Sequence, residues 1–374
     1  MKKLVKILEI VSYSPPRTGW SIRVEYLKKQ LLEMGYECQI LNISPESRRI
    51  KSDEYIDVQN GIDYIFKLGK FCLSGYRIHM HVNGQSPKGF ILTLISEIIG
   101  LVLGKGCFLT FHGGINQRYF PRENSYWILP LISIIFKLPE KIICNDERIK
   151  DKISEYGINR NKIVSIPGFS KQYLSYKETK LPEDLEIFIR QHEPILSSYV
   201  FDRPQFYIPT TLQAIKKLVT NYPDLGLIFV GTSEYSQDTL NLIQILNLEK
   251  NIFLCKNLEH NEFLTLLSKS KICIRSYEWD GVCSSVLQAL SLKIPVIGCE
   301  NPLRPKGVVL FKTGDENSLA EKIEYVLKNY DEVKENIQLP EIKDTVSTEV
   351  ELLTSIVTIH HSPFTIHNFF PKFP

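Results

Sequence analysis

Segment 275–290 holds the residues best suited to chemistry. It reads as the end of a strand, an acidic loop with Asp280 and Gly281, and a helix whose first turn contains Ser284 and Ser285. The first turn of a helix has unpaired backbone N–H groups and the positive end of the helix dipole, so a diphosphate could bind there. The residues alone leave an ordinary capped helix as the alternative.

Two histidines also share a face. His79 and His81 lie two apart on a predicted strand, so both side chains point to the same side of the sheet. Such a pair could bind a metal ion. No third ligand with suitable spacing accompanies them, and we therefore predict no metal and place both histidines in the core or at the edge of a cleft.

The scaffold for these residues is predicted to be two parallel α/β sheets. Strand-length apolar runs occur at 6–12, 38–43, 78–82, 107–111, 141–144 and 162–166, and again at 195–200, 226–231, 251–255, 271–275, 294–298 and 308–312. Helical patterns separate them, as in right-handed parallel crossovers. The strands barely alternate in polarity, which is typical of sheets covered on both faces.

The domain boundaries follow from this alternation. We predict a Rossmann-like domain over 1–168, a linker over 169–193 and a second Rossmann-like domain over 194–340. Residues 341–374 would form a C-terminal helix and tail that packs back on the first domain. Sheets of this kind bind ligands outside the carboxyl ends of their strands, so two of them would face a shared cleft.

Segment 275–290 resembles the signature of family 4 retaining glycosyltransferases of the GT-B fold, which is an acidic residue, seven further residues and then Glu-Ala. Here Asp280 takes the first position, Gln288 the second, and Ala289 follows. Weaker matches occur in the same order at 14–19, 110–114 and 161–167. The resemblance covers roughly residues 5–330.

The resemblance implies a nucleotide-sugar donor, a glycan or lipid-linked acceptor, and no metal or other cofactor. Asp280 would accept hydrogen bonds from donor-sugar hydroxyls, while Gly281, Ser284 and Ser285 would meet the diphosphate. Gln288 would hold the ribose hydroxyls. The resemblance also leads us to expect that the transferred sugar is of the hexose type and that the enzyme acts in surface polysaccharide synthesis.

In the first half, the resemblance assigns roles to one histidine and three glycines. Gly19 would let the first loop approach the diphosphate and the acceptor, because only glycine accepts such closeness cheaply. His112, followed by Gly113 and Gly114, would hydrogen-bond a hydroxyl of the donor sugar. A turn glycine and a structural turn histidine are the alternatives.

Two departures from the family pattern concern binding and charge. Gln288 replaces the usual glutamate, and the lost charge would weaken donor binding by about 1–2 kcal/mol. The lysine that normally neutralises the leaving diphosphate is absent from 198–209. Arg203 or Arg275 must then supply this stabilisation, which is usually the largest catalytic contribution.

Composition and charge narrow the class of protein. The chain has 374 residues and a net charge of +3, without a predicted signal peptide or membrane span, so we expect a cytoplasmic protein with buried free cysteines.

Residues 1–168 hold 24 Lys and Arg against 16 Asp and Glu. This basic half could contact an anionic membrane surface, with apolar segment 126–136 against it. The basic motif with interleaved aromatics of an RNA binder is missing, so no nucleic-acid partner is expected.

Two other functions remain open at this point. A nucleotide-sugar epimerase or hydrolase on the same fold would need no sugar acceptor. A degenerate glycosyltransferase could serve as a binding protein without turnover, given Gln288 and the missing lysine.

Overall fold

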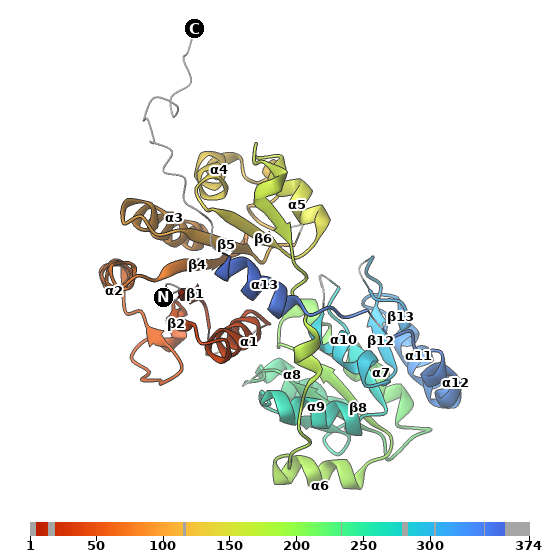
Figure 1. Ribbon diagram of the computed structural model, residues 1–374. Coiled ribbons are helices and arrows are strands. Elements are labelled where there is room, and N and C mark those ends of the chain that lie inside the picture. The colour runs from red at the N-terminus through yellow and green to blue at the C-terminus, as the bar shows by residue number, and fades with distance from the viewer. Residues whose placement is uncertain are drawn as a thin grey trace.

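The computed structural model describes residues 5–13, 19–114, 117–232, 234–278, 283–302, 304–339 and 341–355. Within them the chain forms two α/β units, each built on one parallel sheet (Figure 1). The predicted fold class, with two doubly wound parallel sheets, is confirmed. No helix of the described ranges is long and apolar enough to cross a bilayer.

The first sheet has seven strands in the order β3-β2-β1-β4-β5-β6-β7, all paired in parallel. They are β1 (Lys6–Val11), β2 (Glu37–Asn42), β3 (Ile56–Asp57), β4 (Arg77–Val82), β5 (Cys107–Phe111), β6 (Lys141–Cys144) and β7 (Ile163–Ser165). The helices between them are α1 (Gly19–Glu33), α2 (Gly61–Leu73), α3 (Pro87–Val102), α4 (Leu129–Lys137) and α5 (Glu147–Ser154).

The second sheet has six parallel strands in the order β10-β9-β8-β11-β12-β13. They are β8 (Ile195–Tyr199), β9 (Gly226–Val230), β10 (Ile252–Leu254), β11 (Ile272–Arg275), β12 (Val296–Cys299) and β13 (Val308–Phe311). The helices are α6 (Glu183–Gln191), α7 (Ile208–Leu218), α8 (Gln237–Ile245), α9 (His260–Lys269), α10 (Ser284–Ser291), α11 (Glu316–Lys328) and α12 (Tyr330–Glu335). Strand β3 and helix α12 are short elements that the sequence pattern did not predict.

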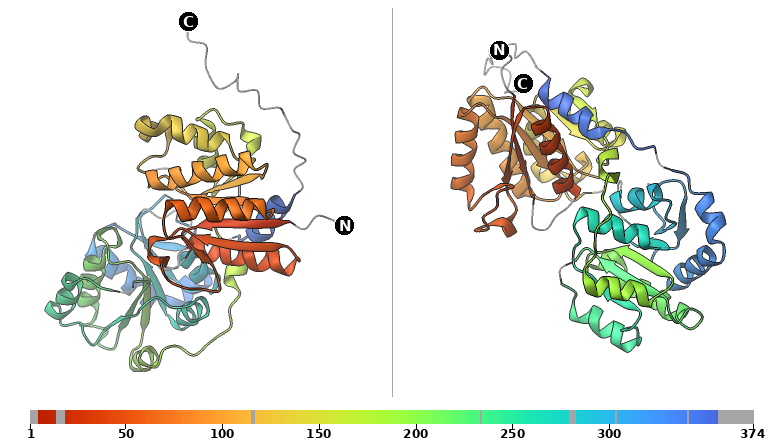
Figure 2. Two further views of the ribbon diagram at one scale, coloured as in Figure 1. Left: turned by 90° about the vertical axis from the view of Figure 1, so that its left-hand side faces the viewer. Right: turned by 60° about the horizontal axis from the view of Figure 1, so that its bottom comes forward.

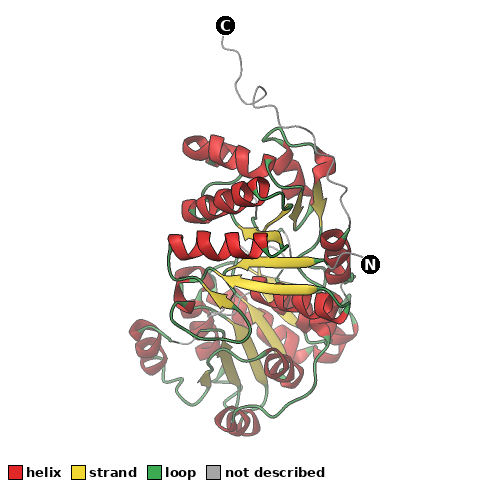
Figure 3. Cartoon of the chain, turned by 60° about the vertical axis from the view of Figure 1, so that its left-hand side comes forward, coloured by secondary structure: helices red, strands yellow, loops and turns green. Residues whose placement is uncertain are grey.

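Helices cover both faces of the first sheet, as the near-continuous apolar strands require (Figure 3). Helices α2, α3 and α4 pack on one face, where Tyr64, Phe90 and Phe136 are fully buried. Helices α1 and α13 (Thr345–Thr354) pack on the other. All eight cysteines are buried and none forms a disulfide bond, as predicted.

Helix α13 comes from the far end of the chain and lies beside α1 (Figures 1 and 2). Its first turn is anchored by Ser170, whose Oγ accepts hydrogen bonds from the backbone of Thr345 (3.0 Å) and Val346 (3.2 Å). Its middle is anchored by a buried ion pair. Nε of Arg23 on α1 donates to Oε2 of Glu349 at 2.7 Å, and Nη2 lies 2.7 Å from the same oxygen.

We predict that Glu349→Ala lowers the free energy of unfolding by about 3–5 kcal/mol, because Arg23 is then a buried charge without its carboxylate. Urea unfolding followed by circular dichroism measures this. Glu351→Ala removes an exposed carboxylate from the same helix and is expected to change little. Equal effects of the two substitutions would contradict the importance of the ion pair.

Candidate functional site

The predicted site residues lie at the carboxyl ends of strands in both sheets. His112 directly follows β5, and Gly19 is the first residue of the helix that follows β1. Arg275 ends β11, and Ser284 begins the next helix, α10. The structure therefore puts these residues at the sheet edges where ligands bind in α/β folds. Asp280 and Gly281 lie outside the described residues.

His112 is held on three sides. Its backbone N–H donates to the carbonyl of Val82 at 2.8 Å, and its ring stacks on Trp20 with centroids 4.3 Å apart. Its Nε2 lies 2.8 Å from Nδ1 of His81. The next residue, Gly113, has no room for a side chain, since a Cβ would lie 2.1 Å from the ring of Phe111. Adjacent Gly114 faces open space.

The N-terminus of α10 has the features expected of an anion site. Cys283 precedes the helix, and its side chain does not cap the backbone N–H groups of the first turn. Ser284 and Ser285 form that turn, with the Ser285 hydroxyl 3.3 Å from the Cys283 sulfur. The first-turn N–H groups therefore receive no side-chain oxygen from the capping residue, and a ligand could satisfy them.

Gln288 lies about one turn after Ser284 on α10 and is buried. Its Nε2 donates to the carbonyl of Tyr173 at 3.3 Å, in the short helix η5 (Lys171–Leu174) of the linker. This contact uses the amide group that a glutamate lacks. The side-chain oxygen is the remaining group with which Gln288 could accept a ribose hydroxyl.

Two arginines lie at the carboxyl edge of the second sheet, in different environments. Arg275 is only 8% exposed, and its Nη1 donates to the carbonyl of Tyr199 at 2.7 Å. Its guanidinium lies 5.3 Å from the ring centre of Phe206. Arg203 is exposed and lies 5.8 Å from the ring centre of Phe201.

A third arginine, which the sequence analysis did not select, lies at the same edge. Arg304 follows β12 and donates from Nη2 to the carbonyl of Tyr277 at 2.6 Å and from Nε to that of Cys299 at 3.1 Å. It thereby holds Tyr277, shortly after the end of β11. The sequence signal for it was only an arginine shortly after a predicted strand.

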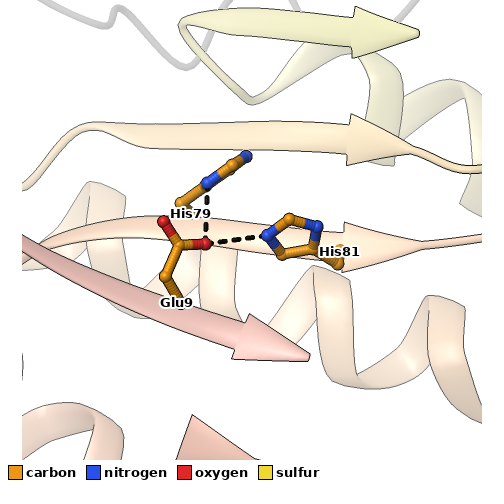
Figure 4. A group of neighbouring side chains, drawn as sticks. All are labelled: Glu9, His79 and His81. Carbon is orange, nitrogen blue, oxygen red and sulfur yellow. Dashed lines mark hydrogen bonds and ion pairs between the residues drawn. The ribbon is translucent and has the colours of Figure 1, made fainter. Parts of the chain in front are cut away.

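A buried polar group of Glu9, His79 and His81 (Figure 4) adjoins His112. It lies on the face of the first sheet that α1 and α13 cover. Oε2 of Glu9 on β1 lies 2.8 Å from Nδ1 of His79 and 2.8 Å from Nε2 of His81, both on β4. Nε2 of His79 lies 2.7 Å from Oγ1 of Thr110. The hydroxyl of Thr110 in turn donates to Oε1 of Glu349 at 3.4 Å.

Burial and neighbouring charge set the protonation of this group. Burial would raise the pKa of Glu9, but the imidazoles of His79 and His81 lower it to about 2. Burial and the neighbouring imidazole of His79 lower the pKa of His81 to about 4. Burial, His81 and Arg23 hold the pKa of His112 well below its usual range. At neutral pH, Glu9 is therefore a carboxylate, and His81 and His112 are neutral.

Glu9, His79 and His81 are also the described residues whose arrangement could hold a metal ion, since their ligand atoms lie within 4.8 Å of one another. Oε1 of Glu9 has no hydrogen-bond partner among the described residues. The sequence analysis identified the two histidines but not the third ligand. The missed signal was a carboxylate inside an otherwise apolar strand.

A cavity of about 610 Å³ opens between the two units, but it contains none of the predicted site residues. It is bounded by α1, by the linker after η5 and by the start of α9, with Tyr26, Lys29, Tyr176 and Asn261 among its lining residues. The hydroxyl of Tyr26 lies 3.3 Å from Nε2 of His260. This contact connects the outer face of α1 to the second unit.

Known proteins resemble the two units unequally in sequence. Residues 189–338 match the family described as glycosyl transferases group 1. A stretch of 114 residues is 30% identical to an uncharacterized glycosyltransferase, MJ1059, of Methanocaldococcus jannaschii. That stretch covers 30% of this chain and 27% of the relative.

Three solved structures share the whole fold. A glycosyltransferase from Rickettsia africae has a TM-score of 0.68 at 17% identity and covers 95% of this chain and 99% of its own. Anabaena HepE with UDP-glucose has a TM-score of 0.68 at 13% identity, covering 93% and 99%. A putative UDP-N-acetylglucosamine 2-epimerase from Listeria monocytogenes has a TM-score of 0.67 at 14% identity, covering 94% and 96%.

At these identities the structural likeness establishes the fold alone. The family match covers the part of the second unit that contains Arg275, α10 and Gln288. Residues 189–338 thus resemble the glycosyl transferases group 1 family, within a fold of two parallel-sheet α/β units of the GT-B type.

Proposed function

We propose that the protein transfers a hexose-type sugar from a nucleoside diphosphate sugar to a glycan or lipid-linked acceptor, in surface polysaccharide synthesis and without a metal. The observation that carries this proposal is the match of residues 189–338 to the group 1 family, in which α10 begins with Ser284 and Ser285 after the carboxyl end of β11. The solved complexes of HepE with UDP-glucose and with UDP and glucose support a donor of this class.

In this proposal the diphosphate binds at the first turn of α10, at Ser284 and Ser285, and Arg275 and Arg203 offset its charge. Gln288 accepts a ribose hydroxyl. Asp280 accepts from the donor sugar. The diphosphate leaves and the acceptor hydroxyl attacks from the same face, so that the anomeric configuration is retained. A diphosphate oxygen takes the proton, and no protein base is then required.

A nucleotide-sugar epimerase or hydrolase is the second candidate, because the structural neighbours include UDP-N-acetylglucosamine 2-epimerases. Such an enzyme uses the same donor pocket without an acceptor. It would isomerise the donor or release free sugar when no acceptor is present. A degenerate glycosyltransferase that only binds the donor would do neither.

We expect one of UDP, GDP, ADP and CMP, each at about 1 mM, to raise Tm by about 2 °C or more, because a ligand that binds only the folded state stabilises it. Thermal-shift measurements on the full chain test this. The responding base then selects the sugar nucleotides for turnover assays. Absence of any shift would contradict a donor site.

We expect Gln288→Met to raise the Kd of that nucleotide about 3- to 10-fold, because the buried side chain keeps its size but loses the oxygen for ribose. Titration calorimetry measures the change. The matched control is Gln237→Met, which alters an exposed glutamine on α8 and should leave the Kd unchanged. An unchanged Kd in Gln288→Met would remove Gln288 from the site.

We further propose that the first unit contacts the cytoplasmic surface of a membrane through the outer faces of α2, α3, the short helix η3 (Tyr126–Ile128) and α4. This helical apolar surface consists of large side chains that remain exposed although their helices are packed: Ile62, Phe66, Leu73, Ile91, Ile98, Leu101, Val102, Tyr126, Trp127 and Ile134. The three helices are neighbours in contact (Figure 1). So many exposed apolar side chains on adjoining helices are typical of an interaction surface.

Charge and aromatic content favour a bilayer as the occupant. Lys70, Lys88 and Lys137 are exposed on the same helices, and residues 1–168 carry 24 Lys and Arg against 16 Asp and Glu. Trp127 is 96% exposed. Tryptophan and lysine next to aliphatic side chains suit the interface of an anionic membrane. A lipid-linked acceptor would then be presented at the same surface.

We expect Phe66→Ser combined with Trp127→Ser to weaken binding to phosphatidylglycerol-containing vesicles at least about ten-fold, because two aromatic side chains no longer enter the bilayer. Cosedimentation measures the bound fraction. Ile245→Ser is the control, since Ile245 is 73% exposed on α8 of the second unit. Membrane contact would be contradicted if the double variant bound vesicles as well as the native protein, or if the substitutions changed the oligomeric state instead of vesicle binding.

A further inference from the structure

A chain of two hydrogen bonds connects a buried carboxylate to His112. Nε2 of His81 lies 2.8 Å from Oε2 of Glu9, and Nδ1 of His81 lies 2.8 Å from Nε2 of His112. The three residues come from β1, from β4 and from the position after β5, which are neighbours in the sheet. Glu9 and His81 have almost no exposed surface, so water does not compete for these contacts.

The order of donors in this chain follows from chemistry. A carboxylate only accepts hydrogen bonds. Nε2 of His81 must therefore carry a hydrogen atom and donate a hydrogen bond to Glu9. A neutral imidazole has one N–H, so Nδ1 of His81 is a lone pair and accepts. Nε2 of His112 must therefore be the donor to His81.

We infer that Glu9 and His81 are positioning residues that lock His112 in the tautomer protonated at Nε2, so that its Nδ1 is a permanent hydrogen-bond acceptor for a sugar hydroxyl. No described residue hydrogen-bonds that Nδ1. The stacked ring of Trp20 and the backbone bond to Val82 fix the ring plane. The role at a sugar rests on the proposed function, whereas the tautomer does not.

A locked acceptor would make recognition selective. A hydroxyl can donate to Nδ1, but a group that only accepts would be repelled, since the tautomer cannot switch while His81 faces Glu9. The preferred ligand is therefore an uncharged donor sugar that presents a free hydroxyl group to Nδ1 of His112.

His79 provides a matched comparison within the same group. It lies on the same strand and face as His81, is equally buried, and also lies 2.8 Å from Oε2 of Glu9. Its other nitrogen contacts Thr110 and not His112. Substitution of either histidine disturbs the same core, but only loss of His81 breaks the chain to His112.

The test is the tautomer of His112, observed by long-range ¹H–¹⁵N spectra of the full chain labelled with ¹⁵N-histidine at neutral pH. The signals of His112 are assigned from their absence in His112→Asn. We expect an Nε2–H and a bare Nδ1 in the native protein and in His79→Phe. In His81→Phe, we expect a mixture of tautomers. An Nδ1–H form in the native protein would overturn the inference.

The same spectra distinguish a metal at Glu9, His79 and His81. An ion there would take the lone pair of His81 Nε2, so His81 would donate from Nδ1 and His112 would hold its proton at Nδ1. That spectrum also overturns the inference. Where His81→Phe does not fold, Glu9→Gln replaces it, because an amide can donate as well as accept and no longer fixes the direction of the chain.

The role at the sugar has a separate readout. His81→Phe should weaken binding of the nucleotide sugar about five-fold and leave binding of the free nucleoside diphosphate unchanged, whereas His79→Phe should change neither. If the tautomer of His112 is fixed but His81→Phe weakens binding of both ligands equally, the tautomer assignment stands. Its role in sugar recognition is then overturned. If no nucleotide binds the native protein at all, the proposed function fails while the tautomer result stands.

Discussion

The buried ion pair between Arg23 and Glu349 is the constraint on which the first unit depends. Neither charge can leave the other without a large desolvation cost, so α13 must stay against α1. The helix pair covers the face of the sheet where Glu9, His79 and Thr110 point. Without that cover, these polar groups would be hydrated and their hydrogen bonds would lose direction. The arrangement around His112 therefore depends on a segment more than 200 residues away.

Because α13 packs on the first unit, the chain crosses between the two units twice. The outgoing linker and the returning segment run side by side, because the N–H of Lys171 donates to the carbonyl of Lys343 at 3.1 Å. Linker residue Tyr173 accepts a hydrogen bond from Gln288 on α10. Two connecting segments restrict the relative motion of the units more than a single segment does. Closure over a ligand would therefore have to bend both connections together, next to the helix proposed to bind the diphosphate.

The sequence predicted the elements well because each depends on local patterns. Apolar runs and helical spacing located both sheets, and the rule for parallel sheets placed His112 and Arg275 at strand ends. The polar group below His112 could not be found in this way, because Glu9 and Glu349 are distant in sequence from the histidines they meet. Only the charge inside the apolar run of β1 indicated a buried partner, and the sequence does not name that partner.

Arg275 and Arg203, two of the arginines at the carboxyl edge of the second sheet, differ in how firmly their side chains are held. This difference bears on how a departing diphosphate would be neutralised. Arg275 is fixed by its bond to the Tyr199 carbonyl and by the ring of Phe206. A fixed and poorly hydrated cation stabilises developing charge without reorganisation. Arg203 is exposed, so it would lose side-chain entropy and hydration before it could contribute equally. In the absence of the usual lysine, we therefore favour Arg275 for stabilising the leaving group and Arg203 for the earlier capture of the anion.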